Sequence, residues 1–405
     1  MTRKEIAYLA LAFSTLALVL YSPALSGSFV GDDYGYVVNN LYIQTGDPRD
    51  LLGLLDPFGP AALFIGNYAP LHLLAHAAEL SAFGADTLGY HVVNVLVHGI
   101  GSALLAALFV RSRIPWGVAV LLALIFLVHP ANVEAVAWVS QLKTCLSFAL
   151  SVAALLALRR PVVAWALFTA ALLTKFSAWY ALPVAAVALW REGTPPRGAR
   201  LSLAAWLASF VLCAIPEFGA FDRLGHTAIL VPYPDGLTHV RSILAYAARY
   251  FVMATTSLGV SAFQEPAPAL SWTDPWCLAG IVLLGLLGAR FVQALRARSE
   301  EAVYWCWALA AYAPISQVFP FAYPMGDRYL YFVLPGLLGA AWFWTRDVLG
   351  RVDAFQNRWA QLRQAGLIAL VLLAAAFSWV SFDRARVWRS DLTVSLDAAR
   401  HYPNG

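Results

Sequence analysis

The sequence predicts an all-α polytopic membrane protein whose chain crosses the bilayer about 11 times. Of its 405 residues, 60% are hydrophobic and only 12% are charged, and the mean hydropathy is +0.67. Soluble domains average about 25% charged residues. The apolar residues gather in long runs, and basic residues cluster between alternate runs. The small net charge of +4 does not indicate a nucleic-acid partner.

The apolar runs are the candidate transmembrane helices, since a spanning helix needs roughly 20 mostly apolar residues. The first run follows a basic start, as in a cleaved signal peptide. We interpret it as a retained helix, because many more runs follow. The predicted spans are residues 6–22, 89–110, 114–129, 141–158, 161–175, 176–190, 201–216, 276–295, 302–320, 329–345 and 365–381.

The basic residues predict the orientation, because Lys and Arg favour cytoplasmic loops. Their distribution is most asymmetric if one further apolar stretch, 241–259, does not span, so we interpret it as interfacial or re-entrant. Arg384, Arg386 and Arg389 are exceptions on the external side. The predicted external segments are 23–88, 130–140, 217–275, 321–328 and the tail 382–405. The predicted cytoplasmic basic residues are Arg3, Lys4, Arg111, Arg113, Arg159, Arg160, Arg191, Arg197, Arg200, Arg290, Arg296, Arg298, Arg346, Arg351, Arg358 and Arg363.

The long external loop 23–88 begins with two adjacent carboxylates, Asp32 and Asp33. A connection of this length usually has a function. Adjacent carboxylates repel each other, which raises one pKa, and such an aspartate can act as a general base toward a hydroxyl. The alternative is a solvated loop or a helix N-cap.

Further polar residues are predicted at the same external face. Glu134 could bind a metal or orient a hydroxyl, and Lys143 could meet an anion. The alternatives are a helix-capping His129 and a Lys143 that reaches outward along the helix. Lys175 alone could be a loop charge. Together, acids beside cations suit transfer from a phosphate-activated, lipid-borne donor, whose leaving group needs preplaced positive charge.

Two other groups are ambiguous. Asp327 and Arg328 begin a run at the external face, where an arginine can bind phosphate through two nitrogens or form a structural ion pair. His91, Asn94 and His98 lie on one helix face, where hydrogen bonds between helices are favoured over binding of a ligand. The cysteines Cys145, Cys213, Cys277 and Cys306 form no C-x-x-C pair, and we interpret them as small buried apolar residues.

Several segments resemble one known family in their order along the chain. The sequence resembles the transmembrane and tetratricopeptide-repeat O-mannosyltransferases and their bacterial relatives, within the glycosyltransferase C superfamily. The resemblance covers roughly residues 20–345 and more faintly the tail. Its segments are "FVGDDYGYVVNN", "NYAPLHLLAHAAELSAFGADTLGYHVVNVLVHGIGSALL", "LVHPANVEAVAWVSQLKTCLS", "LLTKFSAWYALPV" and "GDRYLYFVLPG".

The resemblance implies a membrane glycosyltransferase that transfers a mannose-like hexose from a polyprenyl-phosphate donor to a protein or glycan hydroxyl, with inversion. The active site would face the periplasm or exterior of a bacterial inner membrane. A non-catalytic scaffold that binds a lipid-linked glycan or a partner protein is the alternative. The implied catalytic residues are Asp32, Asp33 and Glu134, which could also hold Mg²⁺ or Mn²⁺. The implied substrate-binding residues are Lys143, Lys175, Asp327, Arg328, Tyr331 and His129, and His91 is a further candidate from its helix face.

The chain departs from the family pattern at a few places. Ala69 in "NYAPL" stands where relatives often have an arginine, and "QLKTC" lacks two charges that relatives often carry there. We predict one domain over residues 1–381. The tail 382–405 resembles the start of a repeat helix.

Overall fold

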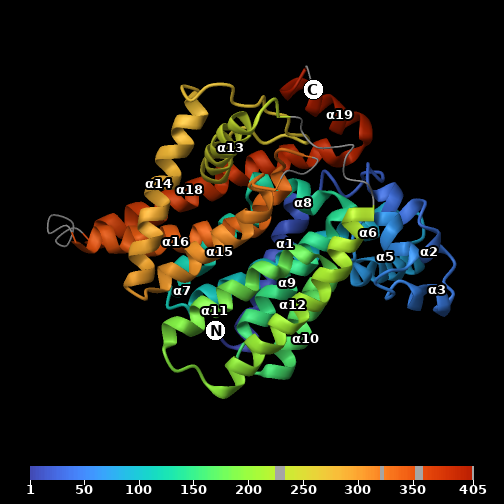
Figure 1. Cartoon of the computed structure of the whole chain (residues 1–405), viewed down its shortest axis with the longest axis horizontal. Helices are drawn as coiled ribbons and strands as arrows, with labels where there is room; N and C mark the ends of the chain where they lie inside the picture. Colours follow the sequence, from blue (N-terminus) through green and yellow to red (C-terminus); the bar gives the residue numbers. More distant parts are fainter. Residues whose placement is uncertain (224–232, 320–322, 352–358, 404–405) are drawn as a thin grey trace.

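The structure is a computed structural model that describes residues 1–223, 233–319, 323–351 and 359–403, and long helices dominate these ranges (Figure 1). Parts of the predicted connections 217–275 and 321–328, residues 404–405 and Arg358 lie outside the described residues, as do the side chains of Arg351 and Arg363. The long helices are α1 (Arg3–Leu20), α6 (Thr87–Arg111), α7 (Trp116–Leu127), α9 (Leu142–Leu156), α10 (Pro161–Thr174), α11 (Ala181–Glu192), α12 (Arg197–Arg223), α13 (Gly236–Thr256), α14 (Pro275–Arg296), α15 (Glu300–Tyr312), α16 (Leu330–Arg351) and α18 (Trp359–Ala385).

The all-α class is confirmed, and each predicted apolar run overlaps one of these helices. The predicted count of about 11 spans is not confirmed. By length and composition, 5 helical segments in the described residues could cross a membrane, or up to 6 if the pair Trp116–Leu127 and Pro130–Ala137, bent by 52°, is one span. Shorter helices account for much of the difference: α10 has 14 residues, or roughly 21 Å, against a hydrocarbon core of roughly 30 Å.

The outer helices carry apolar side chains that no protein group covers. In the most apolar stretch of α14 only 11% of the residues are buried, and in the stretch that includes most of α18 only 17% are. In the corresponding stretch around α9, 72% are buried. Val282 on α14 and Trp379 on α18 are among the exposed side chains. Apolar faces of this extent are stable only against lipid. The chain is therefore an integral membrane protein.

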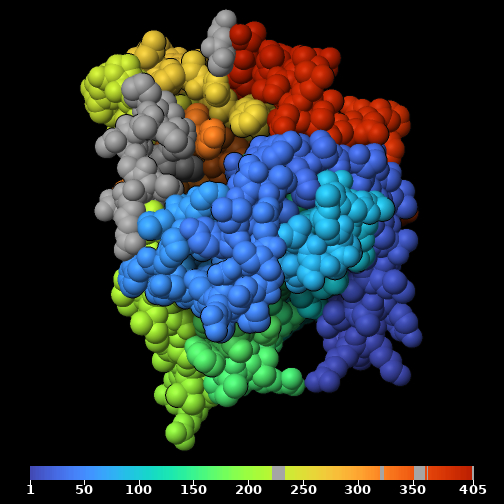
Figure 2. Space-filling view, turned by 90° about the vertical axis from the view of Figure 1, so that its right-hand side faces the viewer, coloured from blue at the N-terminus to red at the C-terminus, as the bar shows by residue number. Residues whose placement is uncertain are grey.

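The first long loop folds into the predicted set of short helices. Prolines at the helix starts suit this, because the first backbone N–H of a helix needs no partner. Loop residues such as Tyr36, Leu54 and Leu73 form a small apolar cluster that packs against Tyr90 of α6. Figure 2 shows it as a blue body on one side of the molecule, directly below the red C-terminal segment. Its helices are η1 (Tyr34–Val38), α2 (Leu41–Gln44), α3 (Pro48–Gly53), α4 (Pro60–Ile65) and α5 (Pro70–Phe83).

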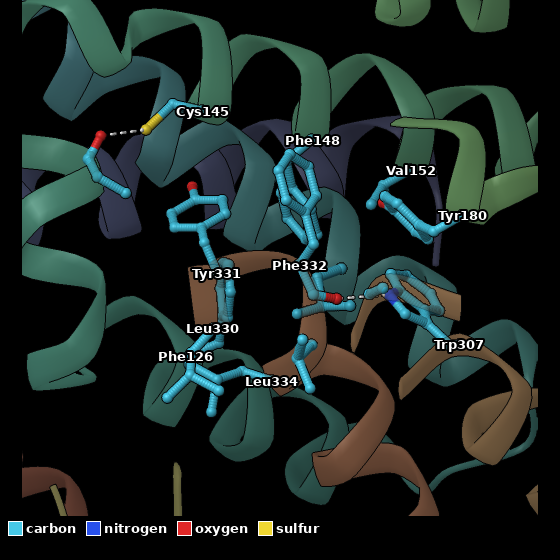
Figure 3. Packing of buried hydrophobic residues seen from close by; sticks show 14 of the residues in the cluster. Phe126, Cys145, Phe148, Val152, Tyr180, Trp307, Leu330, Tyr331, Phe332 and Leu334 are labelled. Carbon is cyan, nitrogen blue, oxygen red and sulfur yellow. Dashed lines mark hydrogen bonds between the residues drawn. The ribbon is translucent and has the colours of Figure 1, made fainter. Parts of the chain in front are cut away.

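The interior is closely packed around α6, α9 and the start of α16. A Cβ on Gly99 of α6 would lie 2.6 Å from the Cα of Ser14 on α1, so only glycine permits this approach. Figure 3 shows the aromatic core beside these helices, where Tyr331 and Phe332 pack near Phe148. This rigid centre supports the polar residues at the N-terminal end of α9.

Candidate active site

The two adjacent aspartates have different environments. Asp33 is 1% exposed; its Oδ2 accepts a hydrogen bond from the Val30 N–H at 2.9 Å, and its Oδ1 accepts one from the Ser140 N–H at 2.7 Å. Burial raises the pKa of Asp33 to about 7, although both hydrogen bonds lower it. Asp32 is exposed, and no hydrogen bond to its carboxylate is found among the described residues.

This difference revises the prediction for the pair. Asp33 connects the start of the first loop to the segment before α9, so its contacts are structural. Of the two, only Asp32 has a carboxylate that is exposed on the protein surface. A turn begins at Gly31, directly before the two aspartates, and the φ of +54° at this position favours glycine.

Glu134 and Arg328 form a buried ion pair. Glu134 lies in the short helix α8 (Val133–Ala137), and Arg328 in the 3₁₀ turn η7 (Asp327–Tyr329). The Arg328 backbone N–H donates to Glu134 Oε2 at 2.8 Å, and its guanidinium pairs with Oε1. The guanidinium carbon lies 5.4 Å from the ring centroid of Trp138 and 4.7 Å from that of Tyr329. Glu134 thus acts as the counter-ion of Arg328.

Asp32 also influences this arginine. Burial alone would lower the pKa of Arg328, but the carboxylate of Glu134 and, more weakly, the charge of Asp32 raise it above its ordinary value. The exposed aspartate and the buried ion pair are therefore close enough to interact electrostatically.

Two lysines add positive charge to the same region. Lys143 Nζ donates to the Tyr36 hydroxyl at 2.8 Å and lies 4.0 Å from that ring's centroid. Lys175 Nζ donates to Thr144 Oγ1 at 2.8 Å. In the described part of the chain neither ammonium forms an ion pair. Thr144 follows Lys143 on α9, and Lys175 interacts electrostatically with Lys143, Arg328 and Glu134, so three basic side chains lie near the buried Glu134.

Asp327 is buried and holds a loop in place. Its Oδ2 accepts from the Ser261 N–H at 2.9 Å, and its Oδ1 from Gln264 Nε2 at 2.8 Å. Gln264 Oε1 in turn accepts from the hydroxyl of Tyr402 at 2.7 Å. Burial, followed by the charge of Glu134, raises the pKa of Asp327 well above its ordinary value. Gln264 thereby links Tyr402 of the C-terminal tail to Asp327, the residue next to Arg328.

The other predicted binding residues have the contacts of interior residues. Tyr331 is fully buried (Figure 3), and its hydroxyl donates to His98 Nδ1 at 2.7 Å. His129 Nδ1 accepts from the Ala131 N–H at 3.1 Å, and its Nε2 donates to the Ala254 carbonyl at 3.1 Å. His91 is 2% exposed, beside the backbone of Gly27. The capping alternative for His129 is confirmed, and these contacts do not support a substrate-binding role.

The metal prediction for Asp32, Asp33 and Glu134 is not supported. In the ranges that the structure describes, no three or more His, Cys, Asp and Glu side chains are grouped to hold a metal ion. The physical reason lies in their partners: backbone N–H groups occupy Asp33, and Arg328 occupies Glu134.

The C-terminal tail packs onto the aspartate loop. Asp391, at the start of α19 (Asp391–His401), accepts from the Gly31 N–H at 2.9 Å, and the Trp388 ring stacks on Trp138 at 5.1 Å. The predicted tail helix is present. Its identity as a repeat helix stays a prediction.

Sequence reasoning did not find two residues near the lysines. Tyr36 accepts from Lys143 and, at 2.9 Å, from Asn67 Nδ2. Glu217 on α12 accepts from the Tyr68 N–H at 2.8 Å, and the charges of Lys143 and Lys175 act on it. A glutamate near the end of an apolar run was the available signal for Glu217, because such residues are costly in a membrane.

Comparisons with known proteins confirm the resemblance over part of the chain. No family model matches. Protein O-mannosyl-transferase Tmtc1 of Drosophila melanogaster is 34% identical over 158 residues, which cover 37% of this chain and 18% of that protein. Protein O-mannosyl-transferase TMTC1 of Mus musculus is 30% identical over 142 residues, covering 32% and 15%. The matched segment thus covers less than a fifth of the length of each of these two relatives.

A solved structure supports the fold. The apo crystal structure of the Archaeoglobus fulgidus oligosaccharyltransferase superposes with a TM-score of 0.51 at 14% sequence identity, covering 95% of this chain and 56% of that chain. The overall arrangement of helices therefore resembles that of this oligosaccharyltransferase.

Proposed function

We propose that this chain is a membrane glycosyltransferase. It transfers a mannose-like hexose from a polyprenyl-phosphate donor to a hydroxyl of a protein or glycan acceptor, with inversion at the anomeric carbon. The site faces the exterior or the periplasm of a bacterial inner membrane. The observation that carries the proposal is the grouping of three basic side chains, Arg328, Lys143 and Lys175, near the buried Glu134 and the exposed Asp32.

The cations suit a departing lipid phosphate. As the bond between the anomeric carbon and the phosphate oxygen breaks, negative charge develops on that oxygen. Arg328, Lys143 and Lys175 are already in place to stabilise it, so little reorganisation is needed in the transition state. Glu134 neutralises only part of this charge. An ammonium group without an ion-pair partner is costly to bury, and an anionic donor supplies such a partner to Lys143 and Lys175.

Asp32 acts as the general base in this proposal. Its carboxylate takes the proton of the acceptor hydroxyl while the hydroxyl oxygen attacks the anomeric carbon from the face opposite the phosphate. Exposure leaves Asp32 accessible to an acceptor, whereas Asp33 is held by two backbone groups. Asp33 is a positioning residue, because it fixes the turn that carries Asp32. No residue of this step requires a metal ion.

The test is a transfer assay with purified protein in nanodiscs. The wild-type chain, given polyprenyl-phosphate mannose and a serine- and threonine-containing peptide, should release polyprenyl phosphate and form glycopeptide. Asp32→Asn should lower turnover by about two decades or more and leave donor binding unchanged. Lys175→Met should weaken donor binding by about one to two decades. If the wild-type protein binds the donor but forms no glycopeptide, the result favours the non-catalytic scaffold.

The scaffold alternative has one specific observation in its favour. Ala69, which is 5% exposed, stands where the family that the sequence resembles often has an arginine, and its neighbour Tyr68 binds Glu217 near the lysines. Ala69→Arg separates the two functions. A scaffold would gain at most donor affinity, whereas an enzyme would also change its rate of release of polyprenyl phosphate.

A further inference from the structure

A second charged region lies at the opposite end of α9 from the candidate site. The 15 residues of α9 separate the two by roughly 22 Å. There, the connections that follow α6, α9, α11 and α14 surround a cleft of about 860 Å³. Four arginines and two glutamates line it, namely Arg111, Arg113, Arg159, Arg191, Glu192 and Glu300.

The glutamates balance only half of the arginines. Arg159 pairs with Glu192 at 3.1 Å, and Arg191 pairs with Glu300. The Arg111 guanidinium donates to the Leu156 carbonyl. Among the described residues, neither Arg111 nor Arg113 forms an ion pair with a carboxylate, so the lining carries a formal excess of two positive charges. Such a cleft attracts an anion, and guanidinium groups match the oxygens of phosphate.

The surroundings of the cleft indicate the depth of lipid headgroups. Trp116, at the start of α7, is 58% exposed, and Trp190, in the last turn of α11, is 45% exposed. Exposed tryptophans concentrate at membrane–water interfaces. A second cleft adjoins the first across the connection after α11; Trp190 and Arg298 line it, with the guanidinium carbon 5.0 Å from the ring centroid.

We propose that this arginine cleft binds the headgroup of an anionic phospholipid, with its phosphate oxygens on Arg111 and Arg113. The volume equals that of about 30 water molecules, which leaves room for a headgroup beside the protein. Basic pockets between membrane helices bind such headgroups through the same contacts. The cleft is separate from the proposed donor site and needs no transferase activity.

The experiment uses the purified full chain in a neutral detergent, with tryptophan fluorescence as the signal. Short-chain phosphatidylglycerol, short-chain phosphatidylcholine and inorganic phosphate are titrated separately. Phosphatidylglycerol should give a saturable change, and phosphatidylcholine should give none. Equal affinity for inorganic phosphate and phosphatidylglycerol would overturn the assignment to a lipid.

Variants locate the binding. Arg111→Gln with Arg113→Gln should weaken phosphatidylglycerol binding at least tenfold. A matched control, Arg49→Gln with Arg386→Gln, removes the same charge from exposed positions outside the cleft and should bind within twofold of the wild type. Arg113→Gln alone is the control for misfolding, because among the described residues its side chain forms no hydrogen bond or ion pair and acts on Glu300 only through its charge. Wild-type affinity in this single variant and in the double variant would overturn the proposal.

Discussion

The charged side chains at the two ends of α9 differ in their burial and in their pairing. At its N-terminal end, Asp33, Glu134 and Asp327 are buried, and each has backbone or guanidinium partners. At its C-terminal end, the arginines are more exposed and outnumber the glutamates. A buried charge must be fully satisfied, so it fixes the geometry around it. An exposed charged side chain is only weakly constrained by its partners, so it can interact with lipid headgroups and solvent.

The largest expected difference between the two ends is their accessibility from outside. We expect Arg49→Cys, in the first loop, to react with a membrane-impermeant maleimide in intact cells. Arg113→Cys, in the arginine cleft, should react only after permeabilisation. The wild type is the control, since three of its four free cysteines are buried. Reaction of Arg113→Cys in intact cells would reverse the predicted orientation.

The sequence predicted the helices better than the site. Long apolar runs mark helices directly, because burial in lipid requires them. The number of spans that the same reasoning gives is not confirmed, since a run of apolar residues can form a short helix such as α10, which stops at Thr174 before Lys175. Composition does not show where a helix turns back.

The different environments of Asp32 and Asp33 could not be read from the dipeptide. They arise from the turn at Gly31 and from Ser140, which is 107 residues away from Asp33 in sequence. The contact between Gly31 and Asp391 spans 360 residues. Tyr331 was grouped with Arg328 by a shared motif, yet the turn of the chain into α16 directs it into the core. Pairings at these separations have no signal in a single sequence.

The next largest effect concerns the buried ion pair. Arg328→Ala leaves the Glu134 carboxylate uncompensated with its side chain 2% exposed, so the free energy of unfolding should fall by about 3–5 kcal/mol. Thermal unfolding in detergent measures this. Adding Glu134→Gln should recover much of the stability but not donor binding.

A matched control at the same face is Arg386→Ala, whose partner Asp383 is exposed, and it should melt like the wild type. Equal melting temperatures for Arg328→Ala and Arg386→Ala would mean that the buried pair does not stabilise the site.

A smaller effect, with a pH dependence, is expected at Asp33. Asn cannot accept hydrogen bonds from both Val30 and Ser140, so Asp33→Asn should cost about 1–3 kcal/mol. Because the pKa of Asp33 is raised from 3.8 to about 7, its contribution is complete below pH 4 and is lost as the pH rises toward 7. The melting-temperature difference between wild type and variant should therefore shrink between pH 5 and pH 7.5. A constant difference would show that Asp33 is ionised throughout.

The smallest expected effect tests how the tail supports the site. The hydroxyl of Tyr402 donates to Gln264, whose amide donates to Asp327, the neighbour of Arg328. Tyr402→Phe leaves Gln264 Oε1 without this donor in a site where Gln264 is 4% exposed, so we expect a loss of about 0.5–1.5 kcal/mol. Tyr8→Phe, at a 71% exposed position on α1, is the control and should change nothing. If the tail positions Arg328, Tyr402→Phe should also raise the donor dissociation constant a few-fold while turnover at saturating donor stays the same. A loss of stability with unchanged donor affinity would limit the tail to a structural role, because Asp327 would then hold Arg328 in place without it.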